Sequence, residues 1–591
     1  MRAANRASVV MLAAALAVAL WDYGRQGPPG AAEPASVARG ESRTTPSPPA
    51  RLLLAPDAYG EDLPPAGASL FDQRVAALGG AAALPYPFEK LLRGLEGGGQ
   101  CADLPDGRCL VRVLIPIGRS LQRLAAAPEF FRHPRVVAAM AGEPAADGPG
   151  PPQRDRLYLG HVGNSDVIEV ISYNEAAARF EFQLVLDYRS GARPRVVYAS
   201  RALCLACHQN HAPIFSRPLW QETNANPAVA ARLAAWQASV AGVPVRRGID
   251  LPGAIDAAAQ RANRFALWQT LWHTGCGDGE RGARCRAALF EATLRYRATG
   301  RHEHAALHDA ILPAFAAAWQ AHWPGGLALP DANIPNRDPL PEGLARADGA
   351  MLANIPAPFE PLAPRPPLEV WRLPDTGRLN ETVAGLAELL GEHDLARLRA
   401  ALHRHPSQAA DFARVSDAIA ALAAAPGRGP FAAGPFRREA LMTALLARLG
   451  SPERESAPLA TAAPVRDSPH FPPATSAGLF QRYCAPCHQT PSGTPPNFLH
   501  GDEATVRDRL RHCAARIRYR LAMWQQQPAA RAKTPMPPLQ ALRPLGADPS
   551  SWAASAELAT LAAYATELAG GAPMPQPDNY EALPPCLPAS G

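Results

Sequence analysis

The chain has 591 residues, of which 47% are hydrophobic and 19% are charged, and its formal net charge is +6. This length allows several folded domains, each with its own hydrophobic core. The small net charge, without a dense basic block interleaved with aromatic residues, argues against nucleic-acid binding. The 64 prolines predict long irregular connections between the folded parts.

The N-terminus has the pattern of a targeting segment. Arg2 and Arg6 precede an apolar run at residues 9–20, which is shorter than a bilayer span of about 20 residues and has the length of a signal-peptide core. We therefore expect residues 1–26 to be a signal peptide, with an uncleaved N-terminal anchor as the alternative. Either form predicts a periplasmic location, and the anchor would provide the only membrane contact, at the inner membrane. Residues 27–67, rich in Pro, Gly, Ser and Ala, are expected to form a disordered linker.

Residues 68–450 are predicted to form a larger α+β domain. Apolar and polar residues alternate most clearly at 179–188, the period of a half-buried strand. Strands are expected at 110–115, 166–173, 179–188 and 196–198. Helices are expected at 121–140, 227–241, 253–273, 284–298, 303–322, 380–404, 408–424 and 436–449. Residues 324–368 are expected to form a surface connection, and residues 451–474 a linker to the next domain.

Two short motifs carry the strongest chemical signal. Residues 204–208 read Cys-Leu-Ala-Cys-His and residues 484–488 read Cys-Ala-Pro-Cys-His, and both match the Cys-x-x-Cys-His attachment signal of c-type haem. At this spacing two thiols can add to the two vinyl groups of one porphyrin, and the next residue brings an imidazole under the iron. The sequence therefore predicts two haem c groups, with their iron, held by Cys204, Cys207, His208, Cys484, Cys487 and His488.

Three further patterns surround the second motif. Gly-Leu-Phe stands at residues 478–480, just before Cys484. Thr-Pro-Met-Pro-Pro follows at 534–538, and Leu558, Leu561 and Tyr564 lie at helical spacing near the end of the chain. Their order and spacing indicate two helices and an intervening proline-flanked loop.

These patterns resemble the class I cytochrome c domain over residues 475–570. In that family a Gly/Phe helix crosses a C-terminal Leu/Tyr helix, and the methionine of a Met-Pro-Pro loop is the sixth iron ligand. The resemblance implies an α-helical class I cytochrome c domain in which His488 is the proximal ligand and Met536 the distal ligand. Thioether ligation raises the potential of a haem and suits electron transfer. Met523, in a helix expected at 516–526, is the alternative ligand. Residues 571–591 are expected to be a C-terminal tail.

The first motif has His208 as its expected iron ligand and several candidates for the opposite side. His211 is too close in sequence to reach that side. The distal candidates are His161, His273, His302, His304, His308, His322 and Met351, and an open sixth position is the alternative. Large aromatic residues often pack against haem, so the tryptophans that follow the motif could surround it, with ordinary core packing as the bland alternative. These are Trp220, Trp236, Trp268, Trp272, Trp319 and Trp323.

Six cysteines remain outside the motifs. An even remainder in an exported protein favours disulfides. Cys101 with Cys109, and Cys276 with Cys285, could close small loops, and Cys513 with Cys586 would then staple the C-terminal domain. Unrelated buried thiols are the alternative.

The predicted fold class is therefore mostly α with a small antiparallel β region, and the predicted function is electron transfer by an exported di-haem c-type cytochrome. The alternative is a di-haem peroxidase or oxygenase, in which an open first haem reacts and the C-terminal haem relays electrons. A third hypothesis makes the N-terminal domain a docking or sensing module. No catalytic residue is identified, since P-loop, Rossmann and zinc-protease motifs are missing from the sequence. A redox partner protein, acidic in character, would fit the arginines of the C-terminal domain, which could also pair with haem propionates or form a solvated helix face. These are Arg507, Arg509, Arg511, Arg516, Arg518 and Arg520.

Overall fold

The computed structural model describes residues 50–571, with gaps at 54–67, 98, 119–125, 127–128, 145–150, 200, 303–304, 337–364, 373–374, 404–408, 452–469, 490–494 and 543–544, and also residues 580, 582–584 and 586. Residues 49–591 form one compact unit. The predicted signal or anchor segment lies outside the described residues, as does nearly all of the predicted linker at 27–67. No helix in the described ranges is long and apolar enough to cross a membrane.

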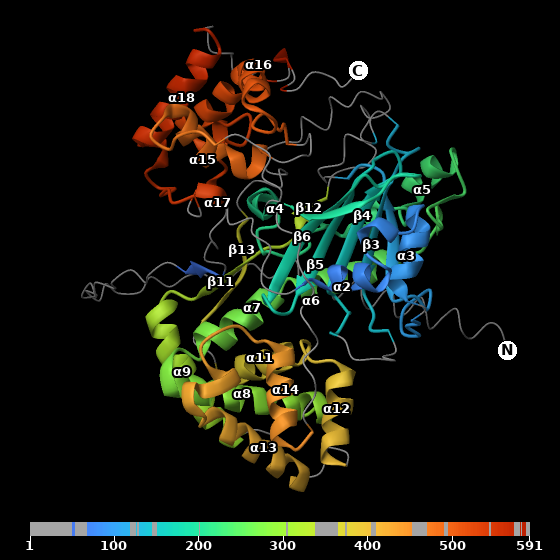
Figure 1. Ribbon diagram of the computed structural model, residues 1–591, viewed down its shortest axis with the longest axis vertical. Helices are drawn as coiled ribbons and strands as arrows, with labels where there is room; N and C mark the ends of the chain where they lie inside the picture. The colour runs from blue at the N-terminus through green and yellow to red at the C-terminus, as the bar shows by residue number, and fades with distance from the viewer. Residues whose placement is uncertain are drawn as a thin grey trace, which may run out of the picture. The chain divides into compact units, whose positions relative to one another are not determined.

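A six-stranded antiparallel sheet forms the centre of the first half of the chain (Figure 1). Consecutive strands pair with each other, in the order β2 (Leu110–Ile115), β3 (Arg135–Met140), β4 (Leu157–Val162), β5 (Ile168–Asn174), β6 (Arg179–Leu186) and β7 (Arg195–Tyr198). The expected strands are confirmed. The helix expected at 121–140 is wrong for residues 135–140, which form β3 and pair along their whole length with β2. The β-branched residues Val136 and Val137 favour this strand.

The two faces of this sheet belong to different hydrophobic cores. Helices α2 (Leu70–Ala77) and α3 (Phe88–Glu96) cover one face, together with α5 (Pro227–Ala234). Helix α6 (Asp250–Ala262) covers the other face. Because successive strand residues point to opposite faces, neighbours in sequence join different cores. Leu159 packs in the α2–α3 core, whereas Tyr158 packs in the α6 core.

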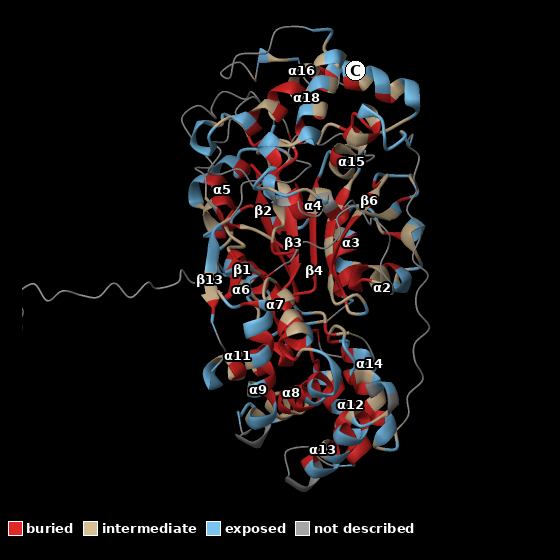
Figure 2. Cartoon of the chain, turned by 90° about the vertical axis from the view of Figure 1, so that its left-hand side faces the viewer, coloured by how far each residue is buried: buried red, intermediate tan, exposed pale blue. Residues whose placement is uncertain are grey.

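A helical layer continues the α6 core. Its members are α7 (Phe265–Thr270), α8 (Gly279–Thr299), α9 (Ala305–His322), α11 (Thr376–Ala387), α12 (Glu392–Leu402), α13 (Ala409–Ala423) and α14 (Arg438–Arg448). Most expected helices are confirmed, but 253–273 is divided between α6 and α7 and 380–404 is divided before Gly391, the N-cap of α12. The helix expected at 227–241 ends at Ala234, and the end of that range holds a short strand, β9 (Ser239–Val240). Figure 2 shows this layer with its buried residues turned inward. A side chain at Gly385 would overlap the Trp268 ring, so this position permits close packing of α11 on α7.

Short strands occupy part of the connection expected at 324–368. Strand β11 (Leu327–Pro330) pairs with β1 (Arg51–Leu52) and β13 (Pro367–Trp371). The expectation of a wholly irregular connection is therefore wrong at both of its ends. The remaining two-residue strands are β8 (Ser216–Arg217), β9 (Ser239–Val240), β10 (Val243–Pro244) and β12 (Ile334–Pro335).

The C-terminal helices enclose a separate hydrophobic core. They are α15 (Ser476–His488), α16 (Glu503–Ala522), α17 (Leu539–Leu542) and α18 (Ala556–Leu568). Helix α18 packs on both α15 and α16, and the rings of Phe480 and Tyr564 lie 5.7 Å apart at the α15–α18 contact. About half of the described residues are helical, and the main sheet is antiparallel, so the predicted mixture of α and β structure is confirmed.

The six cysteines outside the motifs form three disulfides, as predicted. Cys101 bonds to Cys109, Cys276 to Cys285, and Cys513 to Cys586. The first two close loops with sequence separations of 8 and 9, and the third has a separation of 73. Cys586 therefore ties a segment of the predicted tail to α16.

Candidate functional site

The first Cys-x-x-Cys-His motif lies on α4 (Arg201–Cys207), which begins three residues after β7 ends. Helix α4 packs on β6. Its first residue, Arg201, is buried and donates hydrogen bonds from Nη1 to the Phe180 carbonyl at 2.8 Å and to Glu181 Oε2 at 3.1 Å. Both partners belong to β6, so the sheet fixes the start of the helix that carries the motif thiols.

His208 follows α4 directly and is held by its own backbone neighbourhood. Its Nδ1 lies 2.8 Å from the carbonyl oxygen of Ala212. A carbonyl can only accept a hydrogen bond, so Nδ1 carries the hydrogen and Nε2 carries the lone pair of the neutral ring. Burial lowers the pKa of His208 to about 4, which keeps the ring neutral at physiological pH. Phe182 of β6 packs against the ring, with centroids 5.2 Å apart.

Charged groups surround the first motif. Arg135 of β3 forms an ion pair with Glu169 of β5, and both stand on the face of the sheet that faces α4. After burial, which has the larger effect, Glu169 raises the pKa of the Cys204 thiol and Arg135 lowers that of His208. Arg365 acts on His208 in the same direction as Arg135, and its backbone N–H donates to the Gln209 side chain at 3.1 Å. These groups could not be predicted from the motif, because they come from strands and a loop far from it in the chain.

His161, one distal candidate, lies on the wrong face of the sheet. Its strand neighbours Val136 and Ile168 belong to the α2–α3 core. The ring packs against Phe88 at 4.9 Å, and its Nδ1 donates to the Val167 carbonyl at 3.1 Å. His208 packs on the opposite face. The sheet therefore separates His161 from the first motif.

The other described candidates belong to the helical layer. His308 and His322 lie on α9, and His273 lies in the π-helical turn after α7. His302 stacks on Tyr296 of α8 with centroids 4.4 Å apart. Helix α9 packs on α8 and on the turn that holds His273, and α8 and α9 lie well away from α4 in both views (Figures 1 and 2). Candidates His304 and Met351 lie outside the described residues.

Four of the six tryptophans after the first motif pack in the core between helices. Trp268, Trp272, Trp319 and Trp323 are buried in the α6 core. Trp268 contacts Trp371 at 6.0 Å. Trp236 is 56% exposed. The ordinary interpretation of these residues, core packing between helices, is therefore the correct one for the four buried rings.

The second motif occupies the end of α15. Thr475 caps this helix by accepting a hydrogen bond from the Gly478 N–H at 3.0 Å. His488, its last residue, repeats the arrangement of the first motif, because its Nδ1 lies 2.7 Å from the carbonyl oxygen of Pro496. Burial lowers the pKa of His488 to about 4. Phe498 stacks on the ring at 4.3 Å. Nε2 is again the atom that bears the lone pair.

The loop that contains Met536 is held by α16 and the short 3-10 helix that follows it. The Met536 N–H donates to the Arg520 carbonyl at 3.1 Å, and Arg520 Nε donates to the Thr534 carbonyl at 2.6 Å. Trp524 Nε1 donates to the Pro537 carbonyl at 3.1 Å. After the larger effect of burial, the Arg520 charge lowers the pKa of His488. Arg520 therefore holds the loop of the predicted distal ligand and also acts electrostatically on the predicted proximal ligand.

Met523, the alternative ligand, is a buried residue at the end of α16. The arginines of α16 have several roles. Arg507 and Arg511 form exposed ion pairs within the helix, with Glu503 and Asp508. Arg509 donates to the His500 carbonyl at 2.8 Å. The remaining predicted arginines, Arg516, Arg518 and Arg520, lie in the half of α16 nearer to the Met536 loop.

The four motif cysteines are thiols, in contrast to the six that form disulfides. Burial raises the pKa of Cys204, with smaller contributions in the same direction from Glu169 and, on α15, Cys487. Burial likewise raises the pKa of Cys484. Helix α4 contacts both α15 and α17. The two motif helices are thus neighbours within the compact unit.

The donor groups at both motifs fit a c-type haem. Each site supplies two thiols on one helix and a neutral imidazole oriented by a backbone carbonyl, the usual second partner of a metal-bound histidine. Within the described residues no group of three or more His, Cys, Asp or Glu side chains is arranged to hold a bare metal ion. No family model, curated protein or solved structure was found that matches the chain.

Proposed function

We propose that the chain is an exported di-haem c-type cytochrome that transfers electrons. One haem would be attached at Cys204 and Cys207 with His208 as iron ligand. The second would be attached at Cys484 and Cys487, in a C-terminal unit that resembles class I cytochrome c. Each bound haem would supply a one-electron ferric/ferrous couple.

One observation carries this proposal. Both motif histidines donate from Nδ1 to a backbone carbonyl, at 2.8 Å for His208 and 2.7 Å for His488. This bond fixes the tautomer and the ring orientation and presents Nε2 to a metal, as expected of an iron ligand. The same bond occurs in two unrelated local structures, a turn after α4 and a loop after α15. A shared chemical role explains this repetition.

The experiment that tests the proposal counts the haems. The chain is expressed with a haem c maturation system and analysed by denaturing mass spectrometry and a pyridine haemochrome assay. We expect two covalent haems per chain, and one in each of the double variants Cys204→Ala/Cys207→Ala and Cys484→Ala/Cys487→Ala. Replacement of Cys101 and Cys109 is the control and should leave both haems. A double motif variant that retains two haems would contradict the proposal.

The second haem is proposed to have Met536 as its distal ligand. The observation that supports this assignment is the backbone around Met536, which hydrogen bonds with Arg520 and Trp524 hold in place. Replacing Met536 with Ala should abolish the weak near-infrared sulfur-to-iron band of the ferric protein, whereas Met523→Ala should leave it. Thioether ligation raises the potential, so Met536→Ala should also lower the midpoint potential of one haem. An unchanged band in Met536→Ala would reject the assignment.

The peroxidase or oxygenase hypothesis differs at the first haem. The described distal candidates for the first haem lie on the other face of the sheet or in the helical layer. The second haem has a proposed distal ligand in Met536, and the lack of such a ligand among the described candidates at the first haem is what supports this hypothesis. A reactive first haem should give a high-spin ferric spectrum and bind cyanide readily. Low-spin spectra from both haems, inert to added cyanide, would leave electron transfer as the function.

A further inference from the structure

Tyr580 and the described residues that follow it, 582–584 and 586, lie against α16, the helix that holds the Met536 loop. Tyr580 packs on Tyr519 of α16, with ring centroids 5.0 Å apart. Arg516 anchors the backbone that follows, donating to the Leu583 carbonyl at 2.5 Å and to the Pro584 carbonyl at 2.7 Å. The Cys513–Cys586 disulfide adds a covalent tie to the same helix. This part of the predicted tail is therefore fastened to α16 by three independent kinds of contact.

Three cations surround the Tyr580 ring. The guanidinium carbons of Arg516 and Arg520 lie 4.7 and 5.8 Å from the ring centroid, and Lys533 Nζ lies 5.2 Å from it. Like charges repel one another at this spacing. The negative face of an aromatic ring provides an attractive site for a cation within about 6 Å of the ring centroid. Tyr580 thus offsets the cost of gathering three positive groups in one place.

Two of these cations control the loop that carries Met536. The Arg520 guanidinium donates from Nε to the Thr534 carbonyl at 2.6 Å, and the Arg520 backbone carbonyl accepts from the Met536 N–H at 3.1 Å. Lys533 directly precedes Thr534 in the chain. Contact with Tyr580 therefore restrains the loop at its entry and at the residue that holds it.

We propose that Tyr580 is a positioning residue for the iron ligand of the second haem: its ring clamps Arg520 and Lys533 and so keeps the Met536 thioether on the iron. This inference rests on the proposed function, because it requires a haem at Cys484 and Cys487 with Met536 as its ligand. The disulfide and the Arg516 contacts keep the clamp in place.

The test measures how easily an external ligand displaces Met536. Imidazole is titrated into the ferric two-haem protein, and loss of the sulfur-to-iron band reports displacement. Removing the ring in Tyr580→Leu should tighten the apparent imidazole affinity about tenfold, the effect of losing one or two cation–π contacts. Tyr580→Phe keeps the ring and should stay within about twofold of the wild type. Arg511→Gln, on an exposed part of α16, is the matched control for Arg520→Gln, which should behave like Tyr580→Leu.

The outcomes separate the clamp from the function on which it rests. If Met536→Ala loses the band but Tyr580→Leu binds imidazole like the wild type, the clamp is wrong and the haem ligand stands. If Met536→Ala keeps the band, the proposed ligand itself is wrong. Should Tyr580→Leu fail to accumulate, Arg520→Gln, which removes one of the clamped cations and retains Tyr580, gives the same measurement. Wild-type imidazole affinity in that variant would also contradict the clamp.

Discussion

At position 160 the absence of a side chain makes room for an ion pair. A Cβ atom on Gly160 of β4 would overlap the guanidinium of Arg135, which crosses this position to reach Glu169. Arg135 and Glu169 also act electrostatically on the first motif. Gly160 is therefore a packing requirement of the sheet face that supports α4.

Gly160→Ala should accordingly destabilise the protein by about 1–3 kcal/mol, the usual cost of overpacking. Gly163→Ala is the control, because its Cβ would meet no atom within 4 Å. Urea unfolding of the two variants measures the difference. Equal stability of the two would show that Arg135 can move aside without cost.

At the scale of the element, α4 depends on one arginine for its attachment to the sheet. Arg201 shares the buried carboxylate of Glu181 with Arg179, whose Nε lies 2.6 Å from Glu181 Oε1. Burial raises the pKa of Glu181, and the two arginines act against this effect. Without Arg201 the carboxylate would lose its more deeply buried partner.

Arg201→Met should destabilise the protein by about 3–5 kcal/mol and should reduce haem attachment at the first motif more than at the second. A carboxyl group whose folded-state pKa is raised binds protons more tightly in the folded chain, so stability falls as pH rises above its ordinary value of 4.5. The loss in Arg201→Met should therefore be greater at pH 7 than at pH 4.5. Arg195→Met, which removes an exposed ion pair with Asp187, is the control. A pH-independent loss would point to packing rather than charge.

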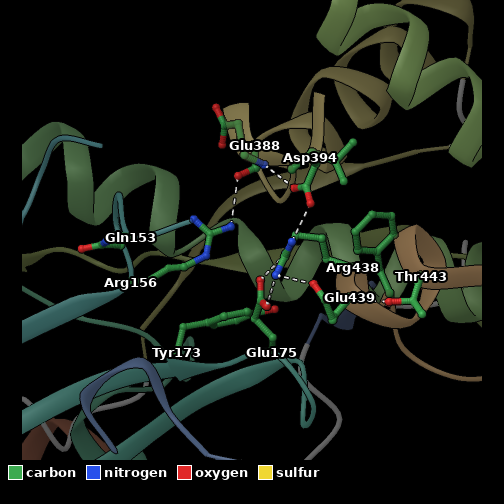
Figure 3. A network of polar contacts seen from close by, with 12 residues as sticks. Gln153, Arg156, Tyr173, Glu175, Glu388, Asp394, Arg438, Glu439 and Thr443 are labelled. Carbon is green, nitrogen blue, oxygen red and sulfur yellow. Dashed lines mark hydrogen bonds and ion pairs between the residues drawn. The ribbon is translucent and has the colours of Figure 1, made fainter. Parts of the chain in front are cut away.

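At the scale of the whole molecule, one buried arginine joins the sheet to the helical layer (Figure 3). Arg438 of α14 donates to both carboxylate oxygens of Glu175, which follows β5, at 2.9 Å each. It also donates to Asp394 of α12 at 2.6 Å. Asp394 in turn accepts from the Gly391 N–H at the start of its helix. Arg156, the residue directly before β4, donates to the Glu388 carbonyl beside this network at 3.1 Å.

Arg438→Met should cost about 3–5 kcal/mol, because it leaves the buried carboxylate of Asp394 and the partly buried carboxylate of Glu175 without their shared partner. The neighbouring Arg437 is exposed, so Arg437→Met should change the free energy of unfolding by less than about 0.5 kcal/mol. Chemical denaturation with both far-ultraviolet and tryptophan signals measures the effect. If the two signals separate in Arg438→Met, the sheet and the helical layer unfold independently once this arginine is removed.

The sequence predicted the elements better than the relations between them. Alternation of apolar and polar residues identified β6, and the motifs located the thiols and imidazoles. Strand β3 was missed because an isolated apolar run does not distinguish helix from strand until its partners are known. The position of His161 could not be predicted either. Alternation along a strand shows which residues share a face of the sheet, but it does not show on which face α4 packs. Tyr580 carries no local signal, because its role depends on three cations that only folding brings together.

The cysteine arrangement has a consequence for the order in which the protein matures. Two disulfides join near neighbours in sequence, and closing such short loops has a small entropic cost. Cys513 must instead find Cys586 across a separation of 73, although Cys484 and Cys487 are closer to it along the chain. On the proposed function, thioether formation removes both competitors permanently. Haem attachment before oxidation of Cys513 would therefore protect the C-terminal unit from mispairing, and the reverse order would expose it to trapped, haem-free isomers.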